Sequence, residues 1–204
     1  MKKQLRIFVL TLIGAMSINS VCAQDFTKSQ MKQAKKEAKA LEKEGWKVTP
    51  GSLSLYEQRL NLVAVQREMD ESGMPKWVIG EGKSTGKVYN AARMQSSTVA
   101  KTDIASKIET EVAGLAEVGL ANDEATLEAV SKALTASKGR FLQKIGRVRT
   151  LMECYRDTPN GNVEVLVTIA YPINEGKKKL KESLYENEET KGKLSKSLDV
   201  IMGW

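Results

Sequence analysis

The alternation of apolar and polar residues is clearest between residues 145 and 170, where it has the period of a β-strand. Apolar side chains occupy every second position at Val163, Val165, Val167 and Ile169. Neighbouring residues of a strand face opposite sides of a sheet, so this spacing puts the four side chains on one face. Asn160-Gly161 just before them favours a tight turn, because both residues tolerate positive φ. The pattern predicts an antiparallel hairpin with one buried face.

A different period, that of an α-helix, runs through the longest regular segment of the chain. Residues 88–118 contain no proline and a single glycine, and small or apolar residues recur three or four positions apart. The residues expected on the buried face are Ala91, Met94, Thr98, Ala105, Ile108, Val112 and Leu115. Their spacing predicts a long helix with one apolar side, which we expect to cover the buried face of the hairpin.

Shorter helices are predicted before and after this helix. The segments 24–46 and 53–71 each carry a thin apolar stripe at helical spacing. A further helix is predicted at 122–138, where Asn122 starts it and Gly139 closes it.

Two other segments have weaker patterns. Strand-forming residues begin at Trp77, and the glycines after it predict a bulge near Gly82. In the segment 174–204, leucines near heptad spacing flank a wholly polar middle at 187–192. That middle predicts either a helix broken at its centre or a partly disordered tail.

Taken together, the patterns predict an α+β fold. A small, mainly antiparallel sheet would pack on the long helix, with additional helices at both ends of the chain. We expect the chain to consist of a signal peptide at 1–23, a helical segment at 24–74, an α+β domain at 75–173 and a C-terminal tail, helical or partly disordered, at 174–204.

The first 23 residues have the three parts of a secretory signal. Three basic residues precede the apolar run 7–16, which is far shorter than the roughly 20 residues that span a bilayer. Val21-Cys22-Ala23 then fits the pattern of small residues at a cleavage site. We therefore expect export, cleavage after Ala23, and a mature chain without a transmembrane span that is periplasmic or associated with the outer membrane.

Cys22 raises the alternative that the chain is lipidated where it is cleaved. The lipidating enzymes expect an aliphatic residue three positions before the cysteine and a small residue just before it, whereas this chain has Asn19 and Val21. We therefore expect a chain that is not anchored by lipid. After cleavage Cys154 is the single remaining cysteine, which excludes an intrachain disulfide, and its apolar neighbours predict that it is buried.

The net charge of the chain excludes nucleic acid as an expected partner. The full chain carries 32 Lys and Arg against 25 Asp and Glu. Without the three basic residues of the leader the balance is 29 to 25, or +4, which is a mildly basic surface. One basic run, Lys177, Lys178, Lys179 and Lys181, would either solubilise a helix end or contact anionic lipid or a polyanionic envelope polymer.

The absence of histidine from the sequence limits the chemistry that the chain can perform. It excludes Ser-His-Asp and Cys-His catalysis as well as histidine zinc sites. An enzyme would depend on a carboxylate pair or on a Ser-Lys pair. The candidate carboxylates Asp103, Glu109 and Glu111 lie on the predicted long helix, where we interpret them as solvated surface groups. We predict no catalytic, cofactor-binding or metal-binding residues and no cofactor.

Gly-Lys-Ser at 82–84 imitates the end of a phosphate-binding loop. The loop motif needs a glycine five residues before Gly82, but Trp77 stands there. The dinucleotide motif would need a third glycine where Thr85 stands. We therefore expect no nucleotide site, and we interpret the glycines as the loosened end of a strand.

The order of elements between residues 75 and 171 resembles the LPP-twenty lipoprotein family of bacterial envelopes. The resemblance rests on three segments, PKWVIGEGKSTG, NAARMQSSTVAKTDIASKIETEV and IGRVRTLMECYRDTPNGNVEVLVTIAY. The preceding GWKVTPGSLSLYEQ also looks like a segment of certain exported proteins. The resemblance implies an α+β domain associated with the envelope, and it supplies no catalytic residues. The chain lacks the lipidation motif of that family, so the resemblance does not extend to membrane anchoring.

We expect, on these grounds, a non-catalytic exported protein of the cell envelope that binds or scaffolds partners. Those partners would be other envelope proteins or envelope polymers. The alternative is a histidine-free hydrolase that acts on envelope glycan or peptide. It requires two carboxyl groups about 5–10 Å apart, or a Ser and a Lys, in one cleft.

Overall fold

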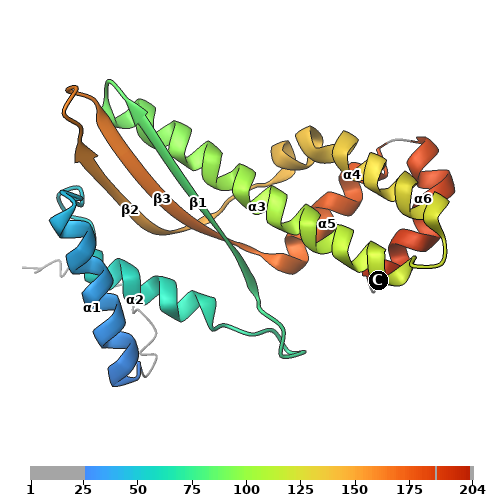
Figure 1. The fold of residues 1–204 in the computed structure, drawn as a ribbon, viewed down its shortest axis with the longest axis horizontal. Helices are drawn as coiled ribbons and strands as arrows, with labels where there is room; N and C mark the ends of the chain where they lie inside the picture. Colours follow the sequence, from blue (N-terminus) through green and yellow to red (C-terminus); the bar gives the residue numbers. More distant parts are fainter. Residues whose placement is uncertain (1–25, 187, 203–204) are drawn as a thin grey trace, which may run out of the picture.

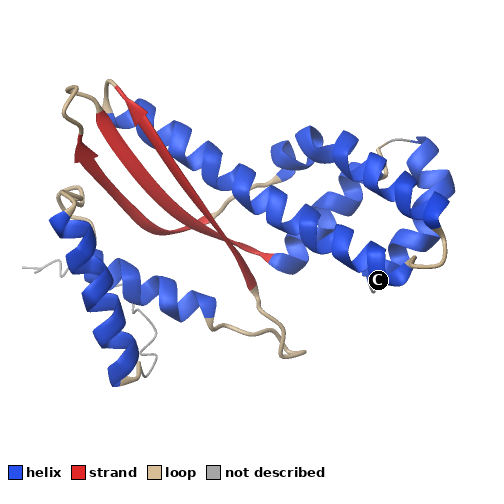
Figure 2. Cartoon of the chain, viewed as in Figure 1, coloured by secondary structure: helices blue, strands red, loops and turns tan. Residues whose placement is uncertain are grey.

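Six helices and a three-stranded sheet make up the part of the chain that the computed structural model describes, residues 26–186 and 188–202 (Figures 1 and 2). The expected α+β fold is confirmed. The sheet and the first two helices occupy one end of the molecule, and a bundle of helices occupies the other (Figure 1). The predicted leader, residues 1–23, lies outside the described residues.

The sheet has the order β1-β3-β2, so that β3 lies between two antiparallel neighbours. Its strands are β1 (Trp77–Gly86), β2 (Arg149–Asp157) and β3 (Val163–Pro172). The turn between β2 and β3 contains Gly161, whose φ of 73° lies in the left-handed region that glycine tolerates. The predicted hairpin is therefore confirmed.

The bulge of the sheet lies in β2. Strand β1 pairs with β3 without interruption, so the expected bulge near Gly82 is wrong. The register of β2 against β3 shifts between Thr150 and Met152 instead. The extra residue lets two successive side chains, Leu151 and Met152, both be buried.

Helices α1 (Lys28–Lys43) and α2 (Leu55–Gln66) begin at capping boxes. Thr27 and Ser54 are the N-cap residues, and each accepts a hydrogen bond from the third helical residue while that residue's side chain accepts one in return. After α1 the chain turns back along the edge of β2, where Lys47 and Tyr155 exchange two backbone hydrogen bonds of 2.7 and 2.8 Å. This bridge brings both helices against the sheet.

Both faces of β3 are buried, which corrects the expectation of one buried face. One face belongs to a core shared with the helices of the bundle, and the other packs against α1 and α2. The first set is Val165, Val167, Ile169 and Tyr171, and the second includes Leu166 and Ala170. A central strand that is covered on both sides has no solvent face, so apolar residues are buried in both of its alternating sets.

The longest helix, α3 (Tyr89–Gly119), joins the two ends of the molecule (Figure 1). Its first half lies on the sheet and its second half contacts α4 (Glu124–Lys144), α5 (Ile173–Leu184) and α6 (Glu188–Met202). Gly139 lies inside α4, so the expected end of that helix was wrong: Phe141, two residues later, is fully buried and keeps the helix packed. The tail is broken into two helices, and the break lies just before its polar middle.

Part of the expected buried face of α3 is exposed. Ala105, Ile108 and Val112 are buried as expected, whereas Met94 is 71% and Leu115 38% exposed. Ala91 and Thr98 are exposed as well. In the first half of the helix the sheet is contacted by the neighbouring stripe, whose residues are Ala92, Ser96 and Ala100.

This stripe of small residues faces the sheet because the backbones of α3 and β1 lie in direct contact. A Cβ atom on Gly82 would lie 2.0 Å from the carbonyl oxygen of Ser96 and 2.5 Å from the backbone nitrogen of Ala100. A Cβ on Gly80 would lie 2.3 Å from the Ala100 carbonyl oxygen. Ser96 also donates a buried hydrogen bond of 2.8 Å to the carbonyl of Val165. A larger side chain such as Met94 cannot occupy this contact.

None of the helices in the described part of the chain combines the length and the apolar character needed to cross a bilayer.

The glycine contact leads to a first prediction. Gly82→Ala should lower the free energy of unfolding by about 2 kcal/mol or more, because the new methyl meets helix backbone that cannot move aside locally. Gly114→Ala is the matched control within α3: nothing lies within 4 Å of its Cβ position, so it should stabilise by about 0.5–1 kcal/mol. Urea denaturation measures both, and equal effects would contradict the contact.

Candidate functional site

The three candidate carboxylates of α3 point to different neighbours. Asp103 accepts a hydrogen bond of 3.0 Å from the backbone N–H of Glu81 and pairs with Lys107 at 2.8 Å. Lys107 in turn donates to the carbonyl of Ile79, so the pair covers the outer edge of β1. This arrangement protects the edge strand rather than forming a cleft.

Glu109 and Glu111 each pair with a lysine of the bundle. Lys138 of α4 lies 3.3 Å from Glu109, and Lys177 of α5 lies 2.7 Å from Glu111. With Asp103 on the edge of β1, the three carboxylates have partners on three different elements. They do not converge on one cleft.

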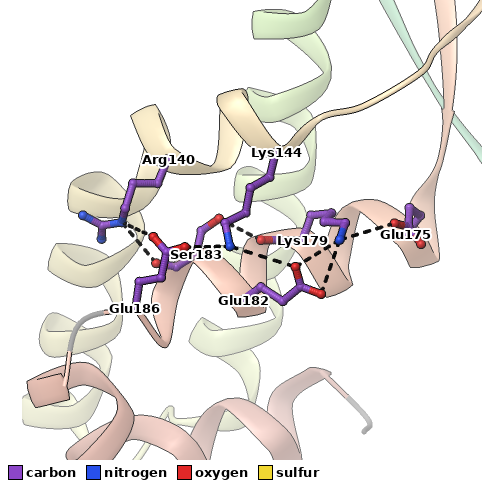
Figure 3. A network of polar contacts seen from close by, with 7 residues as sticks. All are labelled: Arg140, Lys144, Glu175, Lys179, Glu182, Ser183 and Glu186. Carbon is purple, nitrogen blue, oxygen red and sulfur yellow. Dashed lines mark hydrogen bonds and ion pairs between the residues drawn. The ribbon is translucent and has the colours of Figure 1, made fainter.

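The basic run of α5 is largely neutralised by acidic neighbours. Besides the Lys177–Glu111 pair, Lys179 contacts Glu175 and Glu182, and Lys181 contacts Asp199. Figure 3 shows how this network continues to Arg140 and Lys144 of α4 through Glu182 and Glu186. Lys177 therefore joins α5 to α3 and Lys181 joins α5 to α6, whereas α4 is joined to this network by its own Arg140 and Lys144.

Two further features of the sequence are part of the packed structure: Cys154 and the glycine segment 80–84. Cys154 is buried, as predicted, and burial raises the pKa of its thiol to about 12, so the reactive thiolate is not formed near neutral pH. The glycine segment is part of the uninterrupted strand β1, where its glycines admit α3. Among the described residues no three His, Cys, Asp or Glu side chains are grouped as a metal ion would require.

A polar hollow of about 430 Å³ lies beside the bulge of β2 and is open to solvent. It is the candidate functional site. Its walls come from the loop before α2, from α2 itself, from α3 and from β2. The residues that line it are Gly51, Ser52, Leu53, Gln58, Asn61, Arg93, Thr150, Leu151, Met152 and Glu153.

Gln58 connects α2 to the edge of β2 at the hollow. Its Oε1 accepts a hydrogen bond of 2.8 Å from the backbone N–H of Glu153, and its Nε2 donates one of 2.8 Å to the carbonyl of Leu53. Gln58 is buried and both ends of its amide are used. Its rigid position holds the loop before α2 against the strand.

Glu153 is held from the other side by the first turns of α3. Nε of Arg93 lies 2.8 Å from each carboxylate oxygen, and the hydroxyl of Tyr89 donates to Oε1. The Tyr89 ring also packs edge-on against Tyr155 at 5.5 Å between centroids. Residues of α2 and α3 thus meet at one residue of β2: Gln58 at the backbone of Glu153, and Arg93 and Tyr89 at its carboxylate.

The surroundings of this cluster hold Tyr89 and Arg93 in their protonated forms. Burial, reinforced by the hydrogen bond to Glu153, raises the pKa of Tyr89 to about 12. The Glu153 carboxylate likewise raises the pKa of Arg93. Both groups therefore keep their protons near neutral pH, where a general base would have to accept one.

The hollow could not be found from sequence motifs, because its residues come from four separate segments. One signal was present: Glu153 interrupts an otherwise apolar stretch of β2. A charged residue at a half-buried strand position requires a partner, and Arg93 and Tyr89 supply it.

Comparison of the chain with models of protein families, with curated proteins and with solved structures finds no match. The resemblance to the LPP-twenty family therefore stays a prediction from the sequence.

Glu109 offers a test of the interface between α3 and α4. Its side chain is 13% exposed, and its Oε1 is buried without a hydrogen-bond partner among the described residues. Burial raises the pKa of Glu109, against the opposing effect of Lys138. The folded chain therefore holds a proton on Glu109 more readily than the unfolded chain does, and stability from this group is lost as pH rises through the folded pKa.

We predict that Glu109→Gln raises the melting temperature at pH 7, and that the gain shrinks as the pH falls to about 4, the ordinary range of a glutamate. Glu111→Gln is the control, because Glu111 is 40% exposed on the same helix. Melting curves across this pH range measure the effect. A variant less stable than the wild type at pH 7 would mean that the Lys138 pair outweighs the desolvation of Glu109.

Proposed function

We propose that this chain is a non-catalytic exported protein of the cell envelope that binds a partner at the polar hollow beside β2. The observation that carries the proposal is the cluster around Glu153, in which Arg93, Tyr89 and Gln58 hold one strand residue from two sides. Groups held in this way present a fixed pattern to a ligand and lose little conformational freedom when it binds.

Further polar groups are available around this cluster. Ser52, Asn61 and Thr150 line the hollow with two hydroxyls and an amide. These groups suit a partner with its own hydrogen-bonding groups, such as an extended polypeptide segment or the polar face of an envelope polymer.

Export and envelope association are supported by the sequence pattern of residues 1–23 and by the resemblance to envelope lipoproteins. The partners proposed are accordingly other envelope proteins or envelope polymers. The ion pairs of Asp103, Glu109 and Glu111 with separate lysines supply no observation in favour of the hydrolase.

Site-specific photo-crosslinking in cells tests the proposed site. A photoreactive residue in place of Thr150, in the hollow, should give a discrete crosslinked product, and the same residue at the exposed Thr135 of α4 should not. Asn61→Trp fills the hollow and should reduce the product by about tenfold or more, the loss of roughly 1.4 kcal/mol of binding.

Equal crosslinking at the two positions, or none at Thr150, would contradict a partner at the hollow. Hydrolysis of envelope glycan or peptide by the purified mature chain would contradict a non-catalytic role.

A further inference from the structure

Helix α1 carries a continuous stripe of lysines on its outer side. The stripe consists of Lys28, Lys32, Lys35, Lys36, Lys39 and Lys43. At 3.6 residues per turn these positions fall within an arc of about 100° and extend over roughly 22 Å of the helix. The opposite side of α1 contains Ala34 and Ala38, which are buried. All six lysines are exposed.

The stripe is not neutralised by the rest of the molecule. None of its six lysines makes an ion pair or a side-chain hydrogen bond within the described residues. Of the two glutamates in α1, Glu37 pairs with Arg59 of α2 at 3.8 Å, and Glu42 lies beside the stripe. The helix therefore has a charge of +4, as large as the net charge of the whole mature chain.

The contrast with α5 makes the stripe unusual within this protein. Lysines 177, 179 and 181 of α5 have acidic partners, and those contacts hold the bundle together. The lysines of α1 have no such structural task. Their charge is directed outward at one extremity of the molecule, at the end opposite the bundle (Figure 1).

We propose that the lysine stripe of α1 docks on an anionic lipid bilayer surface. A straight row of positive charges on a convex helix fits a flat surface that carries negative charges. Lysine attracts phosphate groups without the two-pronged geometry that arginine uses to recognise individual ones, so a row of lysines favours a charged surface over one bound molecule. The proposed export supplies the compartment in which such a surface is met, and α1 begins shortly after the predicted cleavage site.

This docking is a property separate from partner binding at the hollow. The lysine stripe would hold the mature chain on the membrane by charge alone, with the apolar side of α1 still packed against α2 and the sheet. Binding should therefore be reversible and should fall steeply as salt screens the charges.

Vesicle binding by the mature chain tests the proposal. Cosedimentation is measured with vesicles of phosphatidylcholine alone and of phosphatidylcholine mixed with phosphatidylglycerol, at low and high salt. The stripe variant replaces Lys32, Lys35, Lys36 and Lys39 with Gln. The matched control replaces Lys87, Lys101, Lys178 and Lys196 with Gln, four lysines spread over the chain outside α1. Both variants lower the net charge of the mature chain by four.

The wild type should bind the anionic vesicles at low salt and should not bind the neutral ones. The stripe variant should lose affinity on the order of 600-fold, since each of its four lysines near an anionic surface contributes roughly fivefold. The control should stay within about fivefold of the wild type. Equal losses of affinity in both variants would mean that binding depends on the net charge of the chain and not on the stripe, and would overturn the proposal.

Three other outcomes would also overturn it. They are equal binding to neutral and anionic vesicles, no binding to either, and binding to soluble polyphosphate without binding to anionic vesicles. The last would assign the stripe to a polyanionic polymer. Crosslinking at Thr150 is a separate readout, so failure here leaves the proposed function of the hollow to its own test.

Discussion

The contact between the backbones of β1 and α3 is the constraint on which the remaining structure depends. Gly80 and Gly82 bring the strand so close to the helix that no side chain fits between them. This contact determines which stripe of α3 faces the sheet and in which direction the rest of the helix extends. The same helix then continues beyond the sheet, and its second half provides the surface on which α4, α5 and α6 pack. One buried core thus extends from β3 to the bundle.

The position of α3 also determines the candidate site. Its first turns carry Tyr89 and Arg93 to the edge of β2, where they meet Glu153. From the other face of the sheet α2 supplies Gln58 to the same strand residue. The hollow therefore exists because two helices on opposite faces of the sheet reach one edge. Its lining is polar because an edge strand with a charged residue requires partners on both sides.

Local patterns in the sequence predicted the hairpin, the long helix and the α+β class, because each depends on the spacing of neighbouring residues. The exposure of Met94 was not predictable in this way, since two stripes of α3 compete and the glycines of β1 decide between them. The second buried face of β3 depends on α1 and α2, which lie far away in sequence. Residues of the hollow come together only in three dimensions. The lysine stripe of α1, in contrast, follows from the sequence alone when the positions of its charged residues are compared with the period of an α-helix.

Nuclear Overhauser effects between β1 and α3 test the central contact most directly. In the folded chain an α-proton of Gly82 lies along the direction in which a Cβ would meet the backbone nitrogen of Ala100 at 2.5 Å. A strong cross-peak between an α-proton of Gly82 and the amide proton of Ala100 is therefore expected. The absence of that cross-peak in a spectrum that resolves both protons would contradict the contact, and with it the arrangement of sheet, bundle and hollow described above.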